Sequence, residues 1–175
     1  SLADRARLFR RLVVAVQSLH DRGRLHASID AAHVLVRPGV EPVLVPASSP
    51  RQFGAGCSDL DSCPPDLADV ATLDVPDNLE AASAVLAGRG IRYPATRIDV
   101  YQLGALLCRL FGGETVVAYM YDAEVKQRIP APFRSVVDRA LGHESATRLT
   151  DCGQLLEVLD GAIGQVVGSA GAQPW

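Results

Sequence analysis

The sequence predicts a mainly α-helical domain that contains one short β-hairpin. Several segments repeat their apolar residues at the spacing of an amphipathic helix. Two short β-branched runs flank a Pro-Gly turn, which is the pattern of a hairpin. The 175 residues are 48% hydrophobic and 21% charged, an ordinary globular composition that allows a core without disulfide or metal staples.

The first half of the chain predicts a helix, a hairpin and a long loop, in that order. Residues 2–22 place apolar side chains on one helical face, and Gly23 follows as a helix stop. After a short polar loop, the β-branched runs at 34–36 and 42–45 form the hairpin. Residues 46–80 contain five prolines and no periodic pattern, so we expect a long, irregular and mobile segment there.

The second half of the chain predicts four helices and a short tail. Apolar residues recur there at helical offsets, and glycines or prolines separate the periodic stretches. The expected helices cover residues 96–111, 114–128, 132–142 and a stretch from Thr150 or Asp151 to 166, and the Gly/Ala-rich residues 167–175 are expected to form a flexible tail.

The charge balance and the hydropathy pattern exclude several functions. A net charge of −3 argues against a general nucleic-acid binder. No apolar run approaches the ~20 residues that cross a bilayer, and we find no signal-peptide pattern in the sequence. Sixteen of the 17 basic residues are arginine, which indicates bacterial-type codon usage in a GC-rich genome and leaves Lys126 as the one lysine.

The four cysteines do not predict a metal site. No CxxC motif is present, and the histidines do not lie at zinc-ligand spacing from the cysteines. Free thiols are typical of a reducing compartment, so we expect a cytoplasmic protein. Cys57 and Cys63 would form a disulfide in an oxidising compartment, and the sequence leaves their pairing open.

Parts of the sequence resemble the C-terminal lobe of Ser/Thr protein kinases. Residues 18–36, SLHDRGRLHASIDAAHVLV, are similar to kinase helix E and the catalytic loop that follows it. Residues 96–107, TRIDVYQLGALL, are similar to the helix F signature, and residues 141–150 match the link between the last two large helices more weakly. The resemblance implies a kinase C-lobe-like domain over residues 1–166, in which 46–95 correspond to the activation segment.

Four positions depart from the kinase pattern, and each departure removes a catalytic group. Ser28 stands at the position of the catalytic-base Asp, and a serine cannot accept the substrate proton as a carboxylate does. Asp30 replaces the catalytic-loop Lys, and His33 replaces the Asn that binds a second magnesium. Pro46 falls at the Asp of the Asp-Phe-Gly motif, so that metal ligand is missing as well. A metal or acid–base cluster of Asp30, His33 and Asp99 is a weaker alternative.

Three other positions match structural residues of the family. The resemblance implies that His26 packs beneath the catalytic loop and that Asp99 accepts hydrogen bonds from backbone amides of that loop. Arg148 matches the arginine that pairs with the Glu of an Ala-Pro-Glu motif. The aligned residues 82–84 read Ala-Ser-Ala, so we expect Arg148 to lack that carboxylate partner.

The functional prediction is a catalytically inactive pseudokinase lobe that acts as a protein-interaction or regulatory module. The chain shows no Gly-rich phosphate loop and no strand lysine ahead of the catalytic loop, so no cofactor is expected. The candidate interaction residues are Tyr119, Met120 and Tyr121, with core packing as the alternative for this group. The expected partner is a protein, and a second copy of the chain is one option.

Other interpretations stay open at this point. The chain can be a fragment of a larger Ser/Thr kinase-like signalling protein whose missing N-lobe binds nucleotide. It can also be a structural domain of a membrane-tethered signalling protein. The acidic run Asp59–Glu80 is either solvated or docked on a basic surface, for which the helix that carries Arg7, Arg10 and Arg11 is a candidate.

Overall fold

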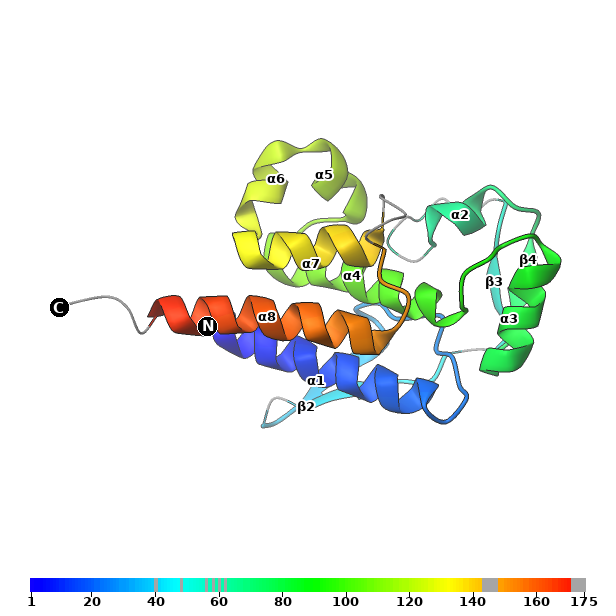
Figure 1. Cartoon of the computed structure of the whole chain (residues 1–175), viewed down its shortest axis with the longest axis horizontal. Helices are drawn as coiled ribbons and strands as arrows, with labels where there is room; N and C mark the ends of the chain where they lie inside the picture. Colours follow the sequence, from blue (N-terminus) through cyan, green and yellow to red (C-terminus); the bar gives the residue numbers. More distant parts are fainter. Residues whose placement is uncertain are drawn as a thin grey trace.

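The protein is mainly helical, as predicted, and four long helices form its main body (Figure 1). They are α1 (Leu2–His20), α4 (Thr96–Gly112), α7 (Ala131–Leu141) and α8 (Cys152–Ala170). Helix α8 lies between α1 and α7 and packs against both, and α7 also packs against α4. The computed structural model describes residues 1–39, 41–47, 49–55, 57, 59, 61, 63–142 and 148–170. Within these ranges no helix is both long and apolar enough to cross a bilayer.

Helix α4 is the centre of the larger hydrophobic core. Thirteen of its 17 residues are buried, as expected for a helix that other elements surround. Gly104 allows α7 to approach closely, because a Cβ built on this glycine would lie 2.7 Å from the Cβ of Ala140. Gly113 follows with a φ of 75° and ends the helix in the left-handed conformation that glycine adopts without strain.

The predicted hairpin is present and packs against α1. Strand β1 (Val34–Arg37) pairs antiparallel with β2 (Glu41–Leu44), with Val34 opposite Leu44. Strand β2 contacts α1, so the hairpin attaches to the main body beside the N-terminal helix (Figure 1).

The prediction of an irregular segment over residues 46–80 is wrong, because this segment builds a second, smaller core. Strand β3 (Arg51–Phe53) pairs antiparallel with β4 (Leu73–Val75), and the short helix α2 (Pro65–Ala68) lies between them in the sequence. Apolar side chains of these elements and the buried Cys63 pack in one cluster with buried side chains of residues 25–27, 82–86 and 95–98. Each element has three or four residues, too few to show a period, so periodicity could not reveal them.

Two further helical regions differ from the prediction. Helix α3 (Leu79–Gly88) was not expected, because its Ala-rich sequence has no clear apolar stripe; the side chain of Asn78 caps its first turn by accepting from the Ala81 amide. Helix α8 continues to Ala170, so residues 167–170 are helical rather than part of a tail. Residues 171–175 lie outside the described part of the chain.

The single helix predicted over 114–128 is two helices, α5 (Val116–Tyr121) and α6 (Ala123–Arg128). They separate at Asp122, whose backbone is extended, with φ −115° and ψ 110°. The Asp122 carboxylate accepts from the amide of Glu124, so it caps α6 at the point where α5 ends. Asp122 is a helix-capping residue type that interrupts the apolar pattern of residues 114–128, and this was the sequence signal for two helices instead of one.

Candidate functional site

The loop that follows α1 crosses the N-terminal half of α4, and two buried side chains of α4 hold its backbone. Asp99 Oδ2 accepts from the His26 amide at 3.0 Å, and Asp99 Oδ1 accepts from the Ala27 amide at 2.6 Å. Gln102 Oε1 accepts from the Ile29 amide at 2.8 Å, while its Nε2 donates to the Ala27 carbonyl at 3.1 Å. Neither Asp99 nor Gln102 is exposed to solvent. The backbone amides of His26 and Ala27 therefore both donate to the Asp99 carboxylate.

These bonds also fix an unusual backbone conformation in the loop. Ala27 has a φ of 56°, in the left-handed region that costs a residue with a Cβ about 1 kcal/mol or more. Its amide donates to Asp99 and its carbonyl accepts from Gln102, so both of its polar backbone groups are fixed by α4. The surrounding hydrogen bonds determine this conformation, as is required for a strained residue to persist.

Asp99 has a third partner at the end of α1. His20 Nε2 lies 2.8 Å from Asp99 Oδ2, and the side chains of both residues are buried. Since Oδ2 of an ionised carboxylate can only accept, the imidazole donates its Nε2 hydrogen in this contact. Asp99 therefore joins the end of α1, the loop and α4 into one hydrogen-bonded unit, and its own side chain is fully buried.

Ser28 lies inside the protein rather than at its surface. The residue is 2% exposed, and its Oγ has no hydrogen-bond partner among the described residues. A serine hydroxyl becomes a nucleophile only when a neighbouring base accepts its proton, and it never acts as a base itself at neutral pH. Because the side chain is buried, its Oγ is not placed at a surface that a substrate can reach.

Asp30 and His33 form a local pair that closes the loop. Asp30 Oδ1 accepts from the amides of Ala32 and His33 at 2.8 and 3.0 Å and lies 2.9 Å from His33 Nδ1. Burial raises the pKa of the Asp30 carboxyl, but the hydrogen bonds from the His33 ring and the two amides outweigh it, so the pKa falls below its usual value. Across the described residues no group of three His, Cys, Asp or Glu side chains could hold a metal ion, so the alternative cluster with Asp99 does not form.

His26 connects the loop to the segment that follows the hairpin. Its Nε2 lies 2.9 Å from the Val45 carbonyl, so the ring donates to the residue that precedes Pro46. The ring packs edge to face against His33, with centroids 6.1 Å apart. His26 therefore connects the loop to the residue that precedes Pro46.

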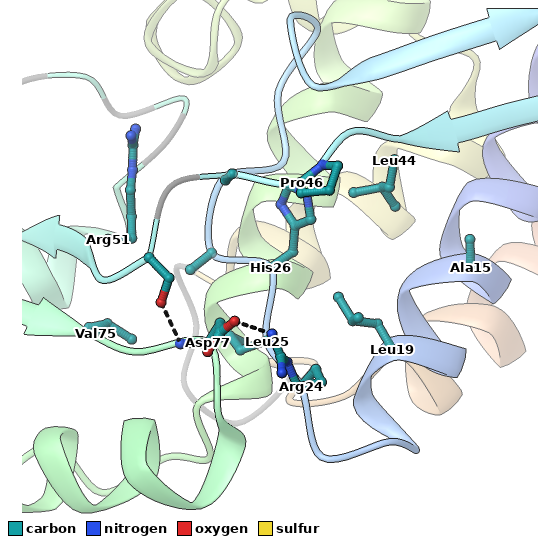
Figure 2. Close-up of a pocket in the computed structure, with 13 residues that line it drawn as sticks. Ala15, Leu19, Arg24, Leu25, His26, Leu44, Pro46, Arg51, Val75 and Asp77 are labelled. Atoms are coloured by element: carbon teal, nitrogen blue, oxygen red, sulfur yellow. Dashed lines mark hydrogen bonds and ion pairs between the residues drawn. The ribbon is translucent and has the colours of Figure 1, made fainter.

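A cavity of about 260 Å³ opens beside this loop (Figure 2). Its walls are largely apolar, and His26 and Pro46 both line it. The carboxylate in its wall, Asp77, pairs with Arg24, and the Asp77 amide donates to Ser49 Oγ at 3.2 Å. A pair of free carboxylates, which acid–base catalysis or metal binding would need, is not found among its described lining residues.

Arg148 has a carboxylate partner, although it is not the Glu of an Ala-Pro-Glu motif, which residues 82–84 lack. Arg148 Nη1 donates to Asp66 Oδ2 at 2.8 Å, and its Nε donates to the Gly142 carbonyl at 3.1 Å. Asp66 belongs to α2, an element that the sequence pattern missed, whereas residues 82–84 lie within α3. The short helix α2 therefore supplies a carboxylate for Arg148 that the alignment to residues 82–84 did not reveal.

The acidic run docks on arginines of the protein, but not on those predicted. Asp61 is buried, and its Oδ2 accepts from Arg109 Nε at 2.6 Å while its Oδ1 accepts from the Val116 amide at 2.7 Å. Sequence reasoning did not identify Asp61, because neither partner is near it in the sequence. The candidate basic helix is engaged elsewhere, with Arg10 bonded to Asp160 of α8 at 2.6 Å.

The candidate interaction residues of α5 divide into one core residue and two surface residues. Tyr119 is 2% exposed, and its hydroxyl donates to Asp138 Oδ1 at 2.8 Å. Met120 and Tyr121 are 37% and 81% exposed, and Val117 beside them is also exposed. Tyr119 is therefore a core residue, and the apolar surface at α5 consists of Val117, Met120 and Tyr121.

Comparisons with solved structures define the fold class as protein kinase-like. The kinase domain of PknI from Mycobacterium tuberculosis, solved as a double mutant, matches 91% of this chain with a TM-score of 0.52 and 18% identity, and a second structure of that domain matches with 0.50 and 17% over 93% of the chain. ROP2 from Toxoplasma gondii, described as a virulence factor with a protein-kinase fold and no enzymatic activity, matches 95% of the chain with a TM-score of 0.59 and 15% identity.

The chain spans about half the length of these structures, 56% of the PknI domain in each case and 46% of ROP2. No protein-family model matches the sequence, and no curated protein does either. Similarity at this level of identity establishes the kinase-like fold and does not extend to activity.

Proposed function

We propose that this chain is the C-terminal lobe of a pseudokinase and that it acts by binding a protein rather than by transferring phosphate. The observation that carries the proposal is the loop held by Asp99 and Gln102. Its backbone is anchored to α4 as a structural unit, while the residue at the catalytic-base position, Ser28, is a buried serine. The scaffold of a catalytic loop is present without the chemical group that phosphoryl transfer needs.

The other replaced positions support the same function. Asp30 puts a carboxylate where a kinase has a lysine, and its hydrogen bonds are made within the loop, to Ala32 and His33. A negative charge there repels a phosphate, which is the opposite of the cationic stabilisation that transfer requires. Pro46 offers no ligand for magnesium. The similarity to ROP2 adds that a kinase-like fold without enzymatic activity has a precedent among proteins of related structure.

A binding role is supported by the exposed apolar group on α5. Aromatic residues and methionine are enriched at the centres of protein interfaces and are uncommon as free surface groups. Tyr121 is 81% exposed, and Met120 and Val117 lie beside it on the same short helix. We expect this group to contribute to the contact with a partner protein.

The second candidate is a larger kinase-like signalling protein in which a further lobe binds nucleotide. It is favoured by the length comparison, because the match covers only 56% of the PknI domain and 46% of ROP2. The two candidates differ in whether nucleotide affinity exists anywhere in the protein that contains this chain.

The test measures nucleotide binding and phosphate transfer together. Thermal unfolding is followed with and without millimolar Mg-ATP, on this chain and on the full-length protein that contains it, and radiolabelled phosphate transfer to a basic substrate protein is measured in parallel. We expect no shift in Tm and no transfer. A ligand at a hundredfold excess over its Kd stabilises the native state by about 2.7 kcal/mol, so a rise of several degrees in the chain alone would contradict the proposal, and a rise confined to the full-length protein would favour the second candidate.

The binding role is tested by affinity capture with matched variants. The wild-type chain, Tyr121→Ala and the control Val14→Ala are used as baits, since Val14 is 43% exposed on α1, away from α5. We expect a protein that the wild type and the control retain and that Tyr121→Ala loses. Identical captured proteins for all three baits would refute a role of the α5 surface.

A further inference from the structure

The cavity beside the loop lies where the two cores meet. Its volume is about 260 Å³, and its walls come from α1, the loop that follows α1, and the strands β2, β3 and β4 (Figure 2). Leu44 in its wall packs with the larger core, whereas Leu25 and Val75 belong to the smaller core. The space is therefore bounded by elements of both cores.

Most of the cavity wall is apolar. Leu19, Leu25, Leu44 and Val75 contribute aliphatic side chains, and Pro46 adds its ring. Apolar walls offer water few hydrogen bonds, so such a cavity favours an apolar guest over water. A cavity of about 150 Å³ with walls of this kind holds one benzene molecule. In proportion to its volume of about 260 Å³, this cavity holds an apolar group of about ten carbon atoms.

The charged side chains at the cavity leave one positive charge without a counterion. Arg24 and Asp77 form an ion pair with each other. Arg51, which also lines the cavity, is half-buried, and the ion pairs found among the described residues do not include it. Figure 2 shows its guanidinium directed away from the Arg24–Asp77 pair. Because partly buried charges are normally paired, Arg51 indicates that an anion belongs at this site.

A second hydrogen-bond donor lies two residues from Arg51 in the sequence. Ser49 lines the cavity, and its Oγ accepts from the Asp77 amide at 3.2 Å. The hydroxyl oxygen is the acceptor in that bond, so the bond does not use the hydroxyl hydrogen. A guanidinium and a hydroxyl both donate to carboxylates, and hydrogen bonds to an ionised acceptor are stronger than those between neutral groups.

We propose that this cavity binds a small organic carboxylate whose apolar part has about ten carbon atoms. The apolar part lies between Leu19, Leu25 and Leu44, and the carboxylate accepts from Arg51 and Ser49. An inorganic anion lacks the apolar part, and a cation of the same size is repelled by Arg51, so both bind more weakly. This site is separate from the protein contact proposed at α5, because the described lining residues of the cavity do not include α5.

Two bicyclic probes of similar shape and opposite charge test the proposal on the whole chain. The protein is titrated with 2-naphthoate and with 2-naphthylmethylammonium at neutral pH, and backbone amide signals are followed by nuclear magnetic resonance. We expect one-to-one binding of 2-naphthoate with a Kd of about 1 mM or tighter, with shifts at Leu25 and Val75. The affinity for the ammonium probe should be at least about tenfold lower.

Two variants with matched controls locate the site. Ala15→Phe fills the cavity from an exposed position on α1, and Val14→Phe places the same side chain on the neighbouring exposed position, which does not line the cavity. Arg51→Gln removes the unpaired charge, and Arg134→Gln removes another half-buried arginine, on α7. Circular dichroism checks that each variant is folded.

We expect Ala15→Phe to lose the binding of 2-naphthoate, while Val14→Phe binds it like the wild type. Arg51→Gln should weaken 2-naphthoate about tenfold and remove its preference over the ammonium probe, while Arg134→Gln keeps both. No saturable binding of 2-naphthoate at several millimolar, or unchanged binding in Ala15→Phe, would overturn the site. Equal affinities for the two probes in the wild type, or a preference that persists in Arg51→Gln, would overturn the role of the arginine.

Discussion

Removal of the Asp99 carboxylate tests whether this residue holds the loop in place. Asp99 has no exposed surface, and it accepts from the amides of His26 and Ala27 and from His20 Nε2. In Asp99→Ala these three donors lose their acceptor inside the protein. A hydrogen bond to a charged group contributes about 1.5–3 kcal/mol, and removal of one member of a buried polar group of this kind costs about 3–5 kcal/mol in total.

The alanine variant also relieves the cost of burying a carboxylate, so we take the lower end and expect a loss of about 3 kcal/mol in the free energy of unfolding. This is a large share of the roughly 5–15 kcal/mol that stabilises a typical domain. With a urea m-value of about 2 kcal/mol/M, the unfolding midpoint should fall by about 1.5 M. Urea unfolding followed by far-ultraviolet circular dichroism measures this directly.

The matched control is Asp77→Ala, which removes a carboxylate of the same size from a partly exposed position. Asp77 is 39% exposed and pairs with Arg24, and such surface pairs contribute about 0–1 kcal/mol. Amide exchange at His26 and Ala27 should also accelerate in Asp99→Ala and stay unchanged in the control. If the two variants unfold at the same urea concentration, Asp99 does not hold the loop and the structural role assigned to it is wrong.

Three further predictions concern helix packing, the loop and its pH dependence. Gly104→Ala should lower the free energy of unfolding by about 1–3 kcal/mol, because the new Cβ would lie 2.7 Å from the Ala140 Cβ of α7. The control Gly161→Ala, whose Cβ would have nothing within 4 Å, should raise it by about 0.5–1 kcal/mol. Equal urea midpoints for the two variants would contradict the close packing of α4 and α7. Gln102→Leu should lose about 2 kcal/mol in urea unfolding by leaving two loop backbone groups unsatisfied. The pKa of Asp30 is lower in the folded than in the unfolded state, so its carboxylate contributes stability that is lost as the pH falls through the folded-state pKa. Asp30→Asn should therefore lose less stability than the wild type when the pH is lowered from about 5. Parallel curves of unfolding free energy against pH for the two proteins would refute this.

The sequence by itself determined the mainly helical fold and the positions of its long helices. Periodicity over ten or more residues is a strong signal, because only a helix places every third or fourth residue on one face. The kinase resemblance around Asp99 implied that this carboxylate accepts from loop amides, and in the structure the amides of His26 and Ala27 donate to it. A buried carboxylate needs hydrogen-bond donors. The loop that carries His26 and Ala27 supplies two backbone amides as these donors.

Only the tertiary structure decided the smaller core and the partners of its charged residues. Elements of three or four residues carry no period, so β3, β4 and α2 form because their apolar side chains meet across a long loop and not because of local propensity. For the same reason Asp66 finds Arg148 and Asp61 finds Arg109, pairs separated by 82 and 48 positions in the sequence. Such contacts depend on how the chain folds back on itself, which no window of neighbouring residues contains.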